Sequence, residues 1–364
     1  MAAAGEDKRL HDDRSVLLMP ERFLVTGAYG CIGAWTVRQL VREGVEVIGV
    51  DAGEDDHRLR ELLEADELAV ARFLKADVSD PAQVADMFAL DPTHVIHLAA
   101  LQVPGCRDNP VLGAQVNVVG TAALFAAALA HGLSSPIVYA SSVAAFAVAD
   151  GEGRVPTDPS GPPETHYGVF KIANEGTARV FALESSLASI GLRPSVVYGA
   201  GRDTGLTSAT TNAMRAAADG SNYTIPFGGS CEFQFAPDAA AAFIAAARAR
   251  FTGAAVVNLP GTTLAIEEVV AEIERVVPES AGTIGFEGSP LPFPEALDSS
   301  PFRSVVGTVP VTPFGQGVAE TVAHFRRSVN GPARDGRRAQ SLVVRGGRDT
   351  ATASDSSNGP RWPL

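Results

Sequence analysis

The chain has 364 residues, 46% of them hydrophobic, and its 42 acidic against 29 basic side chains give a formal net charge of −13. This length and composition suit one large domain or two closely packed ones, and the acidic balance disfavours nucleic acid as a partner because such a surface repels phosphate backbones. The three cysteines, Cys31, Cys106 and Cys231, lack CxxC spacing, which argues against a disulfide framework and against a zinc site.

The N-terminal segment 1–20 is charged and shows no periodicity, so we expect a disordered leader and not a secretory signal. Together with the sparse cysteines, this favours a cytoplasmic protein. Residues 110–149 carry no Asp, Glu, Lys or Arg, as membrane spans often do not. Proline, glycine and asparagine divide this stretch into shorter pieces, and we therefore expect no transmembrane segment and no membrane partner.

Short, almost entirely apolar segments alternate with helix-length patterns from residue 22 onward. The apolar segments are typical of strands buried on both faces of a parallel sheet. Their alternation with helices predicts right-handed crossovers and a doubly wound α/β fold. The predicted strands are 22–26, 45–50, 71–76, 94–99, 136–141 and 193–198, and the predicted helices are 32–43, 117–132 and about 164–189.

The pattern changes after residue 198, where glycine and proline become dense. We expect a first domain at 21–198 that carries the cofactor and the catalytic residues. A smaller, irregular substrate-binding region at 199–330 follows and is partly interleaved with it. The low hydrophobicity of residues 331–364 predicts a disordered tail.

The sequence TGAYGCIG at residues 26–33 joins the first predicted strand to the first predicted helix. Gly27 permits a tight turn, Gly30 lets the backbone approach a pyrophosphate, and Gly33 lets the helix pack closely on the sheet. The N–H groups and the dipole of that helix favour phosphates at its N-terminus. Asp51 lies 18 residues beyond Gly33 and is placed to accept the ribose hydroxyls of an adenosine. No basic residue follows it directly, which favours NAD over NADP.

A tyrosine and a lysine lie four residues apart in the long predicted helix, although the chain has only three lysines and five tyrosines. This spacing puts Tyr167 and Lys171 on one helix face. A nearby ammonium favours the phenolate, so we expect a lowered tyrosine pKa suited to general acid–base catalysis.

Two serines, Ser141 and Ser142, end the predicted strand that precedes this helix. They lie at the carboxyl edge of the sheet, where open α/β sheets bind ligands. A hydroxyl at this edge can hydrogen-bond a substrate carbonyl or alcohol beside the tyrosine.

With these elements, residues 22–325 resemble the extended short-chain dehydrogenase/reductase family, which includes NAD-dependent sugar epimerases, dehydratases and related dehydrogenases. The resemblance implies a Rossmann sheet, NAD as the cofactor and no metal site. The matching motifs are TGAYGCIG, GVDAG, ADVSD, HLAA, NVVGT, YASSVAAF, YGVFK, RPSVVYGAG and FQFAPDAA.

The resemblance also implies roles for individual residues. Tyr167 moves the hydroxyl proton, Lys171 holds the nicotinamide ribose and lowers the tyrosine pKa, and Ser142, 25 residues before Tyr167, orients the reacting oxygen. In this family hydride then passes between the substrate carbon and the nicotinamide. The implied cofactor contacts are the loop residues Gly27, Gly30, Cys31, Ile32 and Gly33, then Asp51, Asp77 and Val78 near the adenosine, Leu98, Ala99 and Ala100 along the cofactor, and Tyr167 and Lys171.

Two departures from the nucleotide-sugar members of this family bear on the substrate. No asparagine occurs between Arg193 and Tyr198, where those members usually carry one. Cys231 stands where they often have an arginine for the diphosphate. Both losses weaken the case for a nucleotide-diphosphate-sugar substrate.

We therefore expect an NAD-dependent oxidoreductase that acts on a polar, sugar-like hydroxyl or carbonyl compound, with Arg202, and after it Arg303, as the arginines able to meet it. The family also implies a homodimer formed through two long helices, here about 110–131 and 164–189. Two alternatives stay open, namely an NAD-dependent sugar or nucleotide-sugar epimerase or dehydratase, and an NAD-sensing binding protein. Such binding proteins typically lose the Tyr–Lys pair, which disfavours the second alternative.

Overall fold

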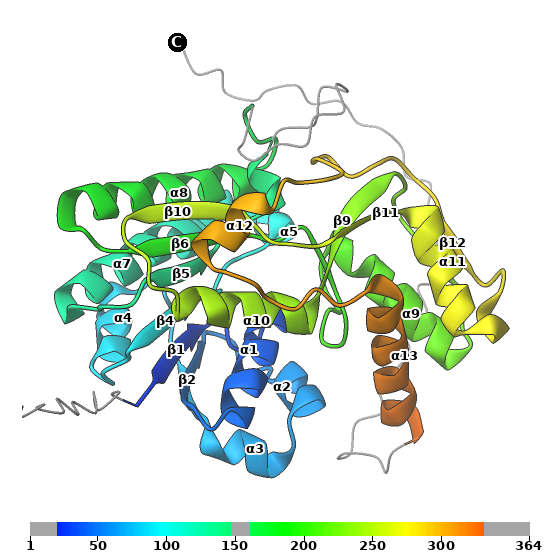
Figure 1. Cartoon of the computed structure of the whole chain (residues 1–364), viewed down its shortest axis with the longest axis horizontal. Helices are drawn as coiled ribbons and strands as arrows, with labels where there is room; N and C mark the ends of the chain where they lie inside the picture. Colours follow the sequence, from blue (N-terminus) through cyan, green and yellow to red (C-terminus); the bar gives the residue numbers. More distant parts are fainter. Residues whose placement is uncertain (1–19, 147–160, 331–364) are drawn as a thin grey trace, which may run out of the picture. The chain divides into compact units, whose positions relative to one another are not determined.

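A central seven-stranded sheet organises the part of the chain that the computed structural model describes, residues 20–146 and 161–330 (Figure 1). Its strands are β1 (Arg22–Thr26), β2 (Glu46–Asp51), β3 (Arg72–Lys75), β4 (His94–His97), β5 (Ile137–Ala140), β6 (Ser189–Arg193) and β10 (Ala254–Asn258). They follow the order β10-β6-β5-β4-β1-β2-β3, and every neighbouring pair is parallel. The predicted doubly wound α/β fold is confirmed.

Helices cover both faces of this sheet. One face carries α1 (Cys31–Arg42), α2 (His57–Leu62), α3 (Ala65–Val70), α10 (Ala236–Ala247) and α12 (Ser300–Val305), and the other carries α4 (Pro81–Phe88), α7 (Gly120–His131) and α8 (His166–Ser185). Phe23 and Val25 of β1 pack toward the first set, whereas Leu24 packs toward the second. This alternation explains why the strand sequences are apolar throughout.

Residues 110–149, which carry no Asp, Glu, Lys or Arg, were expected to be divided into short pieces. Instead, one continuous helical run covers Pro110–His131. It consists of α6 (Pro110–Ala114), a π-helical turn η1 (Gln115–Val119) and α7. Pro110 occupies the first turn, where its missing N–H has no consequence. The run is apolar enough to cross a membrane by length and composition, with a mean hydropathy of 1.6, but Leu124 and Phe125 are fully buried against the sheet. Packing on the sheet thus accounts for part of its apolar character.

The prediction of one strand over 193–198 is wrong, because this segment forms parts of two strands. Residues up to Arg193 belong to β6, whereas β7 (Val196–Tyr198) pairs in a separate sheet. Pro194 lies at the break and has no N–H to donate to a ladder. The preceding helix also ends earlier than predicted, because Ser186 takes a left-handed φ of 58°.

The second region has a core of its own, formed by residues such as Tyr198, Phe233 and Phe314. Its sheets are β11-β9-β7 and β12-β8, and the chain returns from it to add α10 and β10 to the central layers. The remaining elements are α5 (Val103–Asp108), η2 (Val143–Ala145), η3 (Leu206–Ser208), α9 (Ala209–Asp219), β8 (Tyr223–Ile225), β9 (Ser230–Phe235), β11 (Thr262–Ala265), α11 (Ile266–Val276), η4 (Pro278–Ser280), β12 (Ile284–Phe286) and α13 (Phe314–Asn330).

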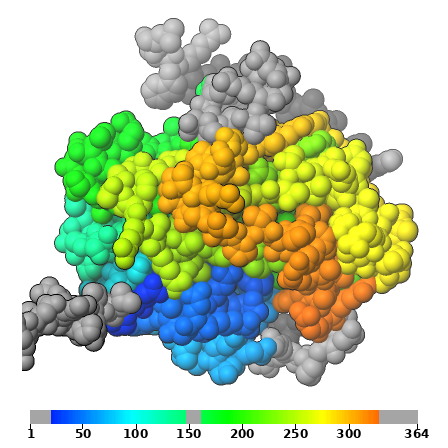
Figure 2. Space-filling view, in the orientation of Figure 1, coloured from blue at the N-terminus to red at the C-terminus, as the bar shows by residue number. Residues whose placement is uncertain are grey.

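A late segment ties the two regions together on the outside. Figure 2 shows α12 and the residues after it (orange) lying across α10 (yellow-green). There Thr312 donates to the Asp238 carboxylate through its backbone N–H and its hydroxyl. The leader and the tail predicted at 1–20 and 331–364 lie outside the described residues, apart from Pro20.

Candidate active site

A pocket of about 840 Å³ lies at the carboxyl ends of the central strands. Open α/β sheets bind their ligands at this edge, next to the point where the strand order reverses, here between β1 and β4. The pocket lining brings together the predicted cofactor contacts and catalytic residues and one of the two predicted substrate arginines: Gly27, Gly30, Cys31, Ile32, Gly33, Asp51, Asp77, Val78, Leu98, Ala99, Ala100, Ser142, Tyr167, Lys171 and Arg202.

The glycine loop leaves no room for side chains at two of its positions. Gly27 has a φ of +70°, and a Cβ there would lie 2.7 Å from the backbone nitrogen of Ala99. A Cβ on Gly33 would lie 2.1 Å from the carbonyl oxygen of Gly27. The turn and the close approach of α1 to the loop therefore require glycine.

The N-terminus of α1 opens into the pocket without a side-chain cap. Gly30 is the N-cap residue, and the first turn holds no acidic residue. Its N–H groups and the positive end of the helix dipole are thus available to an anion. This arrangement fits the pyrophosphate of a dinucleotide.

Asp51 is oriented by backbone groups of its own surroundings. Its two carboxylate oxygens each accept a hydrogen bond of 3.0 Å, from the N–H groups of Tyr29 and Gly53. The nearby basic residue Lys75, at the end of β3, is ion-paired with Glu54. The Asp51 end of the pocket therefore presents a fixed carboxylate, and the lysine near it already has a partner.

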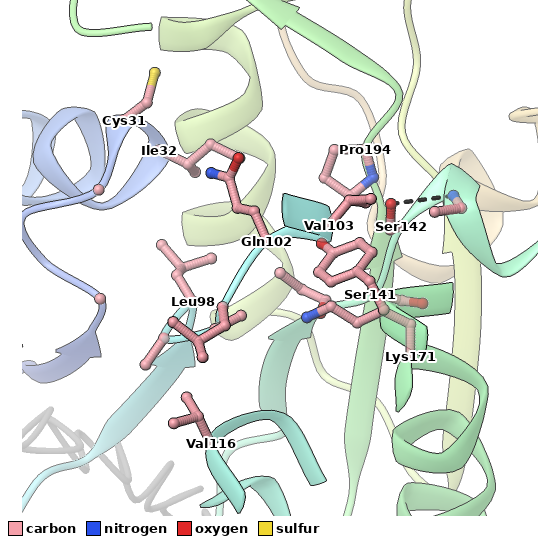
Figure 3. Close-up of a pocket in the computed structure, with 18 of the residues that line it drawn as sticks. Cys31, Ile32, Leu98, Gln102, Val103, Val116, Ser141, Ser142, Lys171 and Pro194 are labelled. Atoms are coloured by element: carbon pink, nitrogen blue, oxygen red, sulfur yellow. Dashed lines mark hydrogen bonds between the residues drawn. The ribbon is translucent and has the colours of Figure 1, made fainter. Parts of the chain in front are cut away.

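The helix α8 and the end of β5 bring the predicted catalytic residues together. Thr165 caps α8, and its hydroxyl accepts from the N–H of Gly168. The Ser142 side chain lies close enough to that of Tyr167 to act on the tyrosine pKa, and its hydroxyl accepts from the N–H of Ala144 at 3.1 Å. The Lys171 amine donates to the carbonyl of Ala140 at 2.7 Å and lies 5.2 Å from the Tyr167 ring centroid. Figure 3 shows Lys171, Ser141 and Ser142 on the same side of the pocket.

The pKa of Tyr167 shifts in the direction opposite to the one expected from the sequence. Burial raises it to about 12, while the hydrogen bond from Ser142 and the charge of Arg202 act to lower it. Burial of the hydroxyl outweighs these favourable neighbours. The phenol is therefore protonated at neutral pH.

Lys171 is buried as well, with 3% of its surface exposed. Burial lowers the pKa of its amine to about 8, and Cys106 and Glu175 act in the opposite direction. Its charge at neutral pH thus depends on the groups that surround it.

Glu175, which no sequence motif singled out, lies one helical turn beyond Lys171. Its carboxylate accepts hydrogen bonds from the Ser141 hydroxyl at 2.5 Å and from two nitrogens of Arg193 at 2.8 Å. The spacing of Lys171 and Glu175 on α8 was a local signal, but nothing local indicated Arg193 on β6 as the partner.

A second contact that the sequence did not reveal joins the two regions beside the glycine loop. Asp203 accepts hydrogen bonds from Arg58 and forms a 2.6 Å contact with His57, both near the start of α2. Arg58 also donates to the carbonyl of Tyr29. The loop after β7 is thereby held against the glycine loop, and Arg202 within it donates to Thr207 at 2.6 Å.

Three further residues, Arg303, Cys231 and His97, lie away from the predicted catalytic residues or within a core. Arg303 is exposed on α12 and lies outside the pocket, so it does not reach a ligand there. Cys231 is buried in the second core. His97 is buried between the hydroxyls of Thr26 and Thr121, as a core histidine. Among the described residues no group of three or more His, Cys, Asp or Glu is arranged to hold a metal ion.

Comparison with known proteins gives a consistent result. The model of the NAD dependent epimerase/dehydratase family matches residues 23–259. The UDP-glucose 4-epimerase of Mycolicibacterium smegmatis is 28% identical over 326 residues, which cover 84% of this chain and 98% of that protein. The structure of Thermus thermophilus UDP-glucose 4-epimerase in complex with NAD is 25% identical, with a TM-score of 0.69 over 84% of this chain and 99% of that one. L-threonine dehydrogenase from Clostridium difficile shares the fold, with a TM-score of 0.72 at 20% identity over 86% of this chain and 99% of that one.

Proposed function

Because this chain belongs to the NAD dependent epimerase/dehydratase family, we propose that it oxidises or reduces a sugar-like hydroxyl or carbonyl compound in the pocket at the sheet edge. The main support for this proposal is that Tyr167, Lys171 and Ser142 line the same pocket as the glycine loop. When bound, NAD supplies the exchange of a hydride with the substrate carbon.

We assign the following roles to the residues of the chain. The N-terminus of α1 holds the pyrophosphate, and Asp51 accepts the ribose hydroxyls. Ser142 orients the substrate oxygen, and Tyr167 gives a proton to that oxygen or takes one from it. The Lys171 ammonium binds the nicotinamide ribose and, as a nearby positive charge, favours the ionised form of the tyrosine. Burial disfavours that form, whereas Ser142 and the Arg202 charge also favour it.

For the substrate we propose a compound without a diphosphate, such as a free sugar, sugar acid or polyol. A buried diphosphate needs cationic partners, because unpaired charge in a partly dry cleft is costly. Of the arginines named for the second region, Arg202 lines the pocket, whereas Arg303 does not. Arg202 then meets a carboxylate or a hydroxyl of the substrate.

A second candidate is a sugar-nucleotide epimerase. It is favoured by the similarity to the mycobacterial UDP-glucose 4-epimerase along nearly the whole length of that protein. An epimerase keeps its NAD bound and regenerates it in each turnover, so the two candidates differ in net NADH formation.

Two measurements separate the candidates. Absorbance of NADH is followed while the purified protein is given free sugars, sugar acids and polyols, and net NADH formation supports the dehydrogenase. The NAD-loaded protein is then titrated calorimetrically with UDP, UDP-glucose and dTDP. Micromolar binding of any of these, with isomerisation and no net NADH, contradicts the first proposal and supports the epimerase. NAD binding without turnover of any compound supports the sensing protein.

We also propose that residues 21–198 bind NAD and carry the catalytic residues, and that residues 199–330 bind the substrate.

A homodimer is proposed as well, because apolar side chains are exposed on the two neighbouring helical elements predicted to form it. Val111 is 70% and Leu183 is 71% exposed. Sedimentation at micromolar concentration tests the dimer, and a single monomeric species contradicts it. The exposed apolar residues are Val111, Leu112, Val119 and Leu129 on Pro110–His131 and Val169, Val180 and Leu183 on α8.

A further inference from the structure

The carboxylate of Glu175 occupies a central position behind the predicted catalytic residues. It lies on α8 four residues after Lys171 and eight after Tyr167, so the three side chains share one helix face. Its side chain is 12% exposed, and that of its partner Arg193 is 2% exposed. Two of its hydrogen bonds form a fork with Arg193, the geometry in which carboxylate and guanidinium bind most strongly.

This pair connects three separate elements. Arg193 is the last residue of β6, and Ser141, whose hydroxyl donates to Glu175, directly follows β5. The carbonyl before it, that of Ala140, accepts from Lys171 on α8. Lys171 and Glu175 therefore hold two consecutive residues of the β5 end, and the next residue in the chain is Ser142.

The position of Ser142 follows from these contacts. Ser141 donates its N–H to Leu192, and Val143 donates its N–H to Pro194, so the segment is also bonded to β6 and its end. Ser142 has little freedom to move relative to α8 once Glu175 and Arg193 are paired. The distance from Ser142 to Tyr167, on which proton transfer depends, is set by this arrangement.

We propose that Glu175, fixed by Arg193, is a positioning residue that holds the Ser142 end of β5 against Tyr167 and keeps a negative charge beside Lys171. This inference rests on the proposed catalytic roles of Ser142, Tyr167 and Lys171. Glu175 touches neither substrate nor cofactor in this scheme and acts through the three residues that do.

The charge of Glu175 has a consequence that a purely structural contact does not have. The groups that act electrostatically with Lys171 are His97 on β4, Cys106 on α5, and Glu175 on its own helix, with Tyr167 beside it and Arg193 behind Glu175. Among them Glu175 and Cys106 raise the pKa of the Lys171 amine. Removing the Glu175 charge while the Arg193 charge stays should lower that pKa further.

The test uses the full-length protein and the variants Glu175→Gln, Glu175→Asp and Ser141→Ala. The control is Glu184→Gln, which changes an exposed carboxylate on the same helix. NADH affinity is measured by fluorescence titration between pH 6 and pH 10, and kcat is measured at the pH optimum. The NADH titration does not need turnover, so it remains informative if no substrate is found and the proposed function fails.

We expect NADH affinity of the wild type to fall as pH rises past about 8, where the Lys171 amine loses its proton. In Glu175→Gln this fall should move to lower pH by about one unit, and in Glu175→Asp, which keeps the charge, the midpoint should stay in place. Ser141→Ala and Glu175→Asp should lower kcat about tenfold through a displaced Ser142.

An unchanged midpoint in Glu175→Gln, equal to that of Glu184→Gln, would overturn the electrostatic part of the proposal. Wild-type kcat in both Ser141→Ala and Glu175→Asp would overturn the positioning part. If Glu175→Gln does not fold, these last two variants still decide the positioning part, because each keeps a carboxylate for Arg193.

Discussion

The half of the molecule built on the central sheet and the half contributed by the second region contain charged groups whose polar atoms are satisfied differently. In the half built on the central sheet, the carboxylates of Asp51 and Glu175 have partners supplied by the protein itself, since Asp51 accepts two backbone N–H groups and Glu175 pairs with Arg193. In the half contributed by the second region, the Arg202 Nε is buried without a hydrogen bond among the described residues. Glu232 on β9, which does not line the pocket, is 3% exposed and accepts from the N–H of Leu297, with no basic side chain among its hydrogen-bond partners in the described residues.

This difference affects which groups hold their geometry before a ligand binds. Groups that are satisfied internally hold their geometry before any ligand arrives, which suits proton transfer and cofactor binding. Groups that are buried without full partners destabilise the protein until a ligand or a proton meets them. Asp51 and Glu175 therefore hold their geometry without a ligand, whereas the Arg202 Nε is left without a partner in the described residues.

The strongest test of the first half is Tyr167→Phe. The ring still packs, but no hydroxyl remains to carry the proton, so kcat should fall about 10²–10⁴-fold while NADH affinity stays within about twofold. Steady-state kinetics and fluorescence titration measure the two quantities. Tyr223→Phe, at a remote position on β8, is the matched control. Near-normal turnover in Tyr167→Phe would mean that the tyrosine only packs.

Glu232 allows a test of the second half through stability. Burial raises the pKa of its carboxyl to about 7 from an ordinary 4.5. A raised pKa means that the folded state binds the proton more tightly than the unfolded state does. The contribution of Glu232 to the stability of the fold is therefore fully present below the ordinary pKa and is lost as pH rises through about 7.

Glu232→Gln should abolish this loss, because the amide keeps an acceptor for Leu297 and carries no charge. At pH 8 the free energy of unfolding of the variant should exceed that of the wild type by up to about 3 kcal/mol, and at pH 4 the two should agree. Urea unfolding at several pH values measures the difference, with exposed Glu287→Gln as the control. Parallel pH profiles for Glu232→Gln and the wild type would show that the buried carboxyl does not titrate.

The variant Arg202→Met tests whether Arg202 binds the substrate. If Arg202 meets a substrate carboxylate, its loss removes a charged hydrogen bond worth about 1.5–3 kcal/mol, and KM should rise about 10–100-fold. The KM for an uncharged polyol should not rise in this variant. The control Arg303→Met, on the exposed α12, should change neither the KM for the carboxylate substrate nor the KM for the polyol. Equal KM changes for charged and uncharged substrates would argue against a carboxylate partner.

Asp51→Ala is expected to have the smallest effect. The wild type should prefer NADH over NADPH, because a 2′-phosphate would meet the Asp51 carboxylate, and the variant should narrow that preference by about tenfold. Fluorescence titration with both cofactors measures it, with exposed Asp86→Ala on α4 as the control. Equal affinity of the wild type for the two cofactors would contradict the assignment of Asp51.

The sequence predicted the features that depend on local backbone geometry. The glycine loop, the Tyr167–Lys171 spacing and most of the strands are encoded in a few neighbouring residues, and they were placed correctly in the fold. The break at Pro194 depends on β9, which comes more than thirty residues later and pairs with β7. The direction of the Tyr167 pKa shift depends on how deeply the hydroxyl is buried, which no local pattern indicates.

Contacts between distant residues were the part that could not be predicted. Arg193 and Asp203 are unremarkable in sequence, and their partners Glu175 and Arg58 are known only from the fold. The same holds for Glu232, whose unusual environment arises because Leu297 is brought to it from 65 residues away. Side chains whose partners lie far away in the sequence therefore carried the weakest sequence signal.

The position of β10 at the edge of the central sheet has a consequence for how the chain is made. On the ribosome β6 is complete at Arg193, but its neighbour β10 is not complete until Asn258, 65 residues later. At synthesis rates of about 5–20 residues per second this delay lasts roughly 3–13 s. During this delay β6 is an exposed edge strand of the sheet, and its unpaired backbone groups can pair with another nascent chain. Truncated products that end before residue 254 should accordingly aggregate, and a greater supply of chaperones should raise the yield of the full chain.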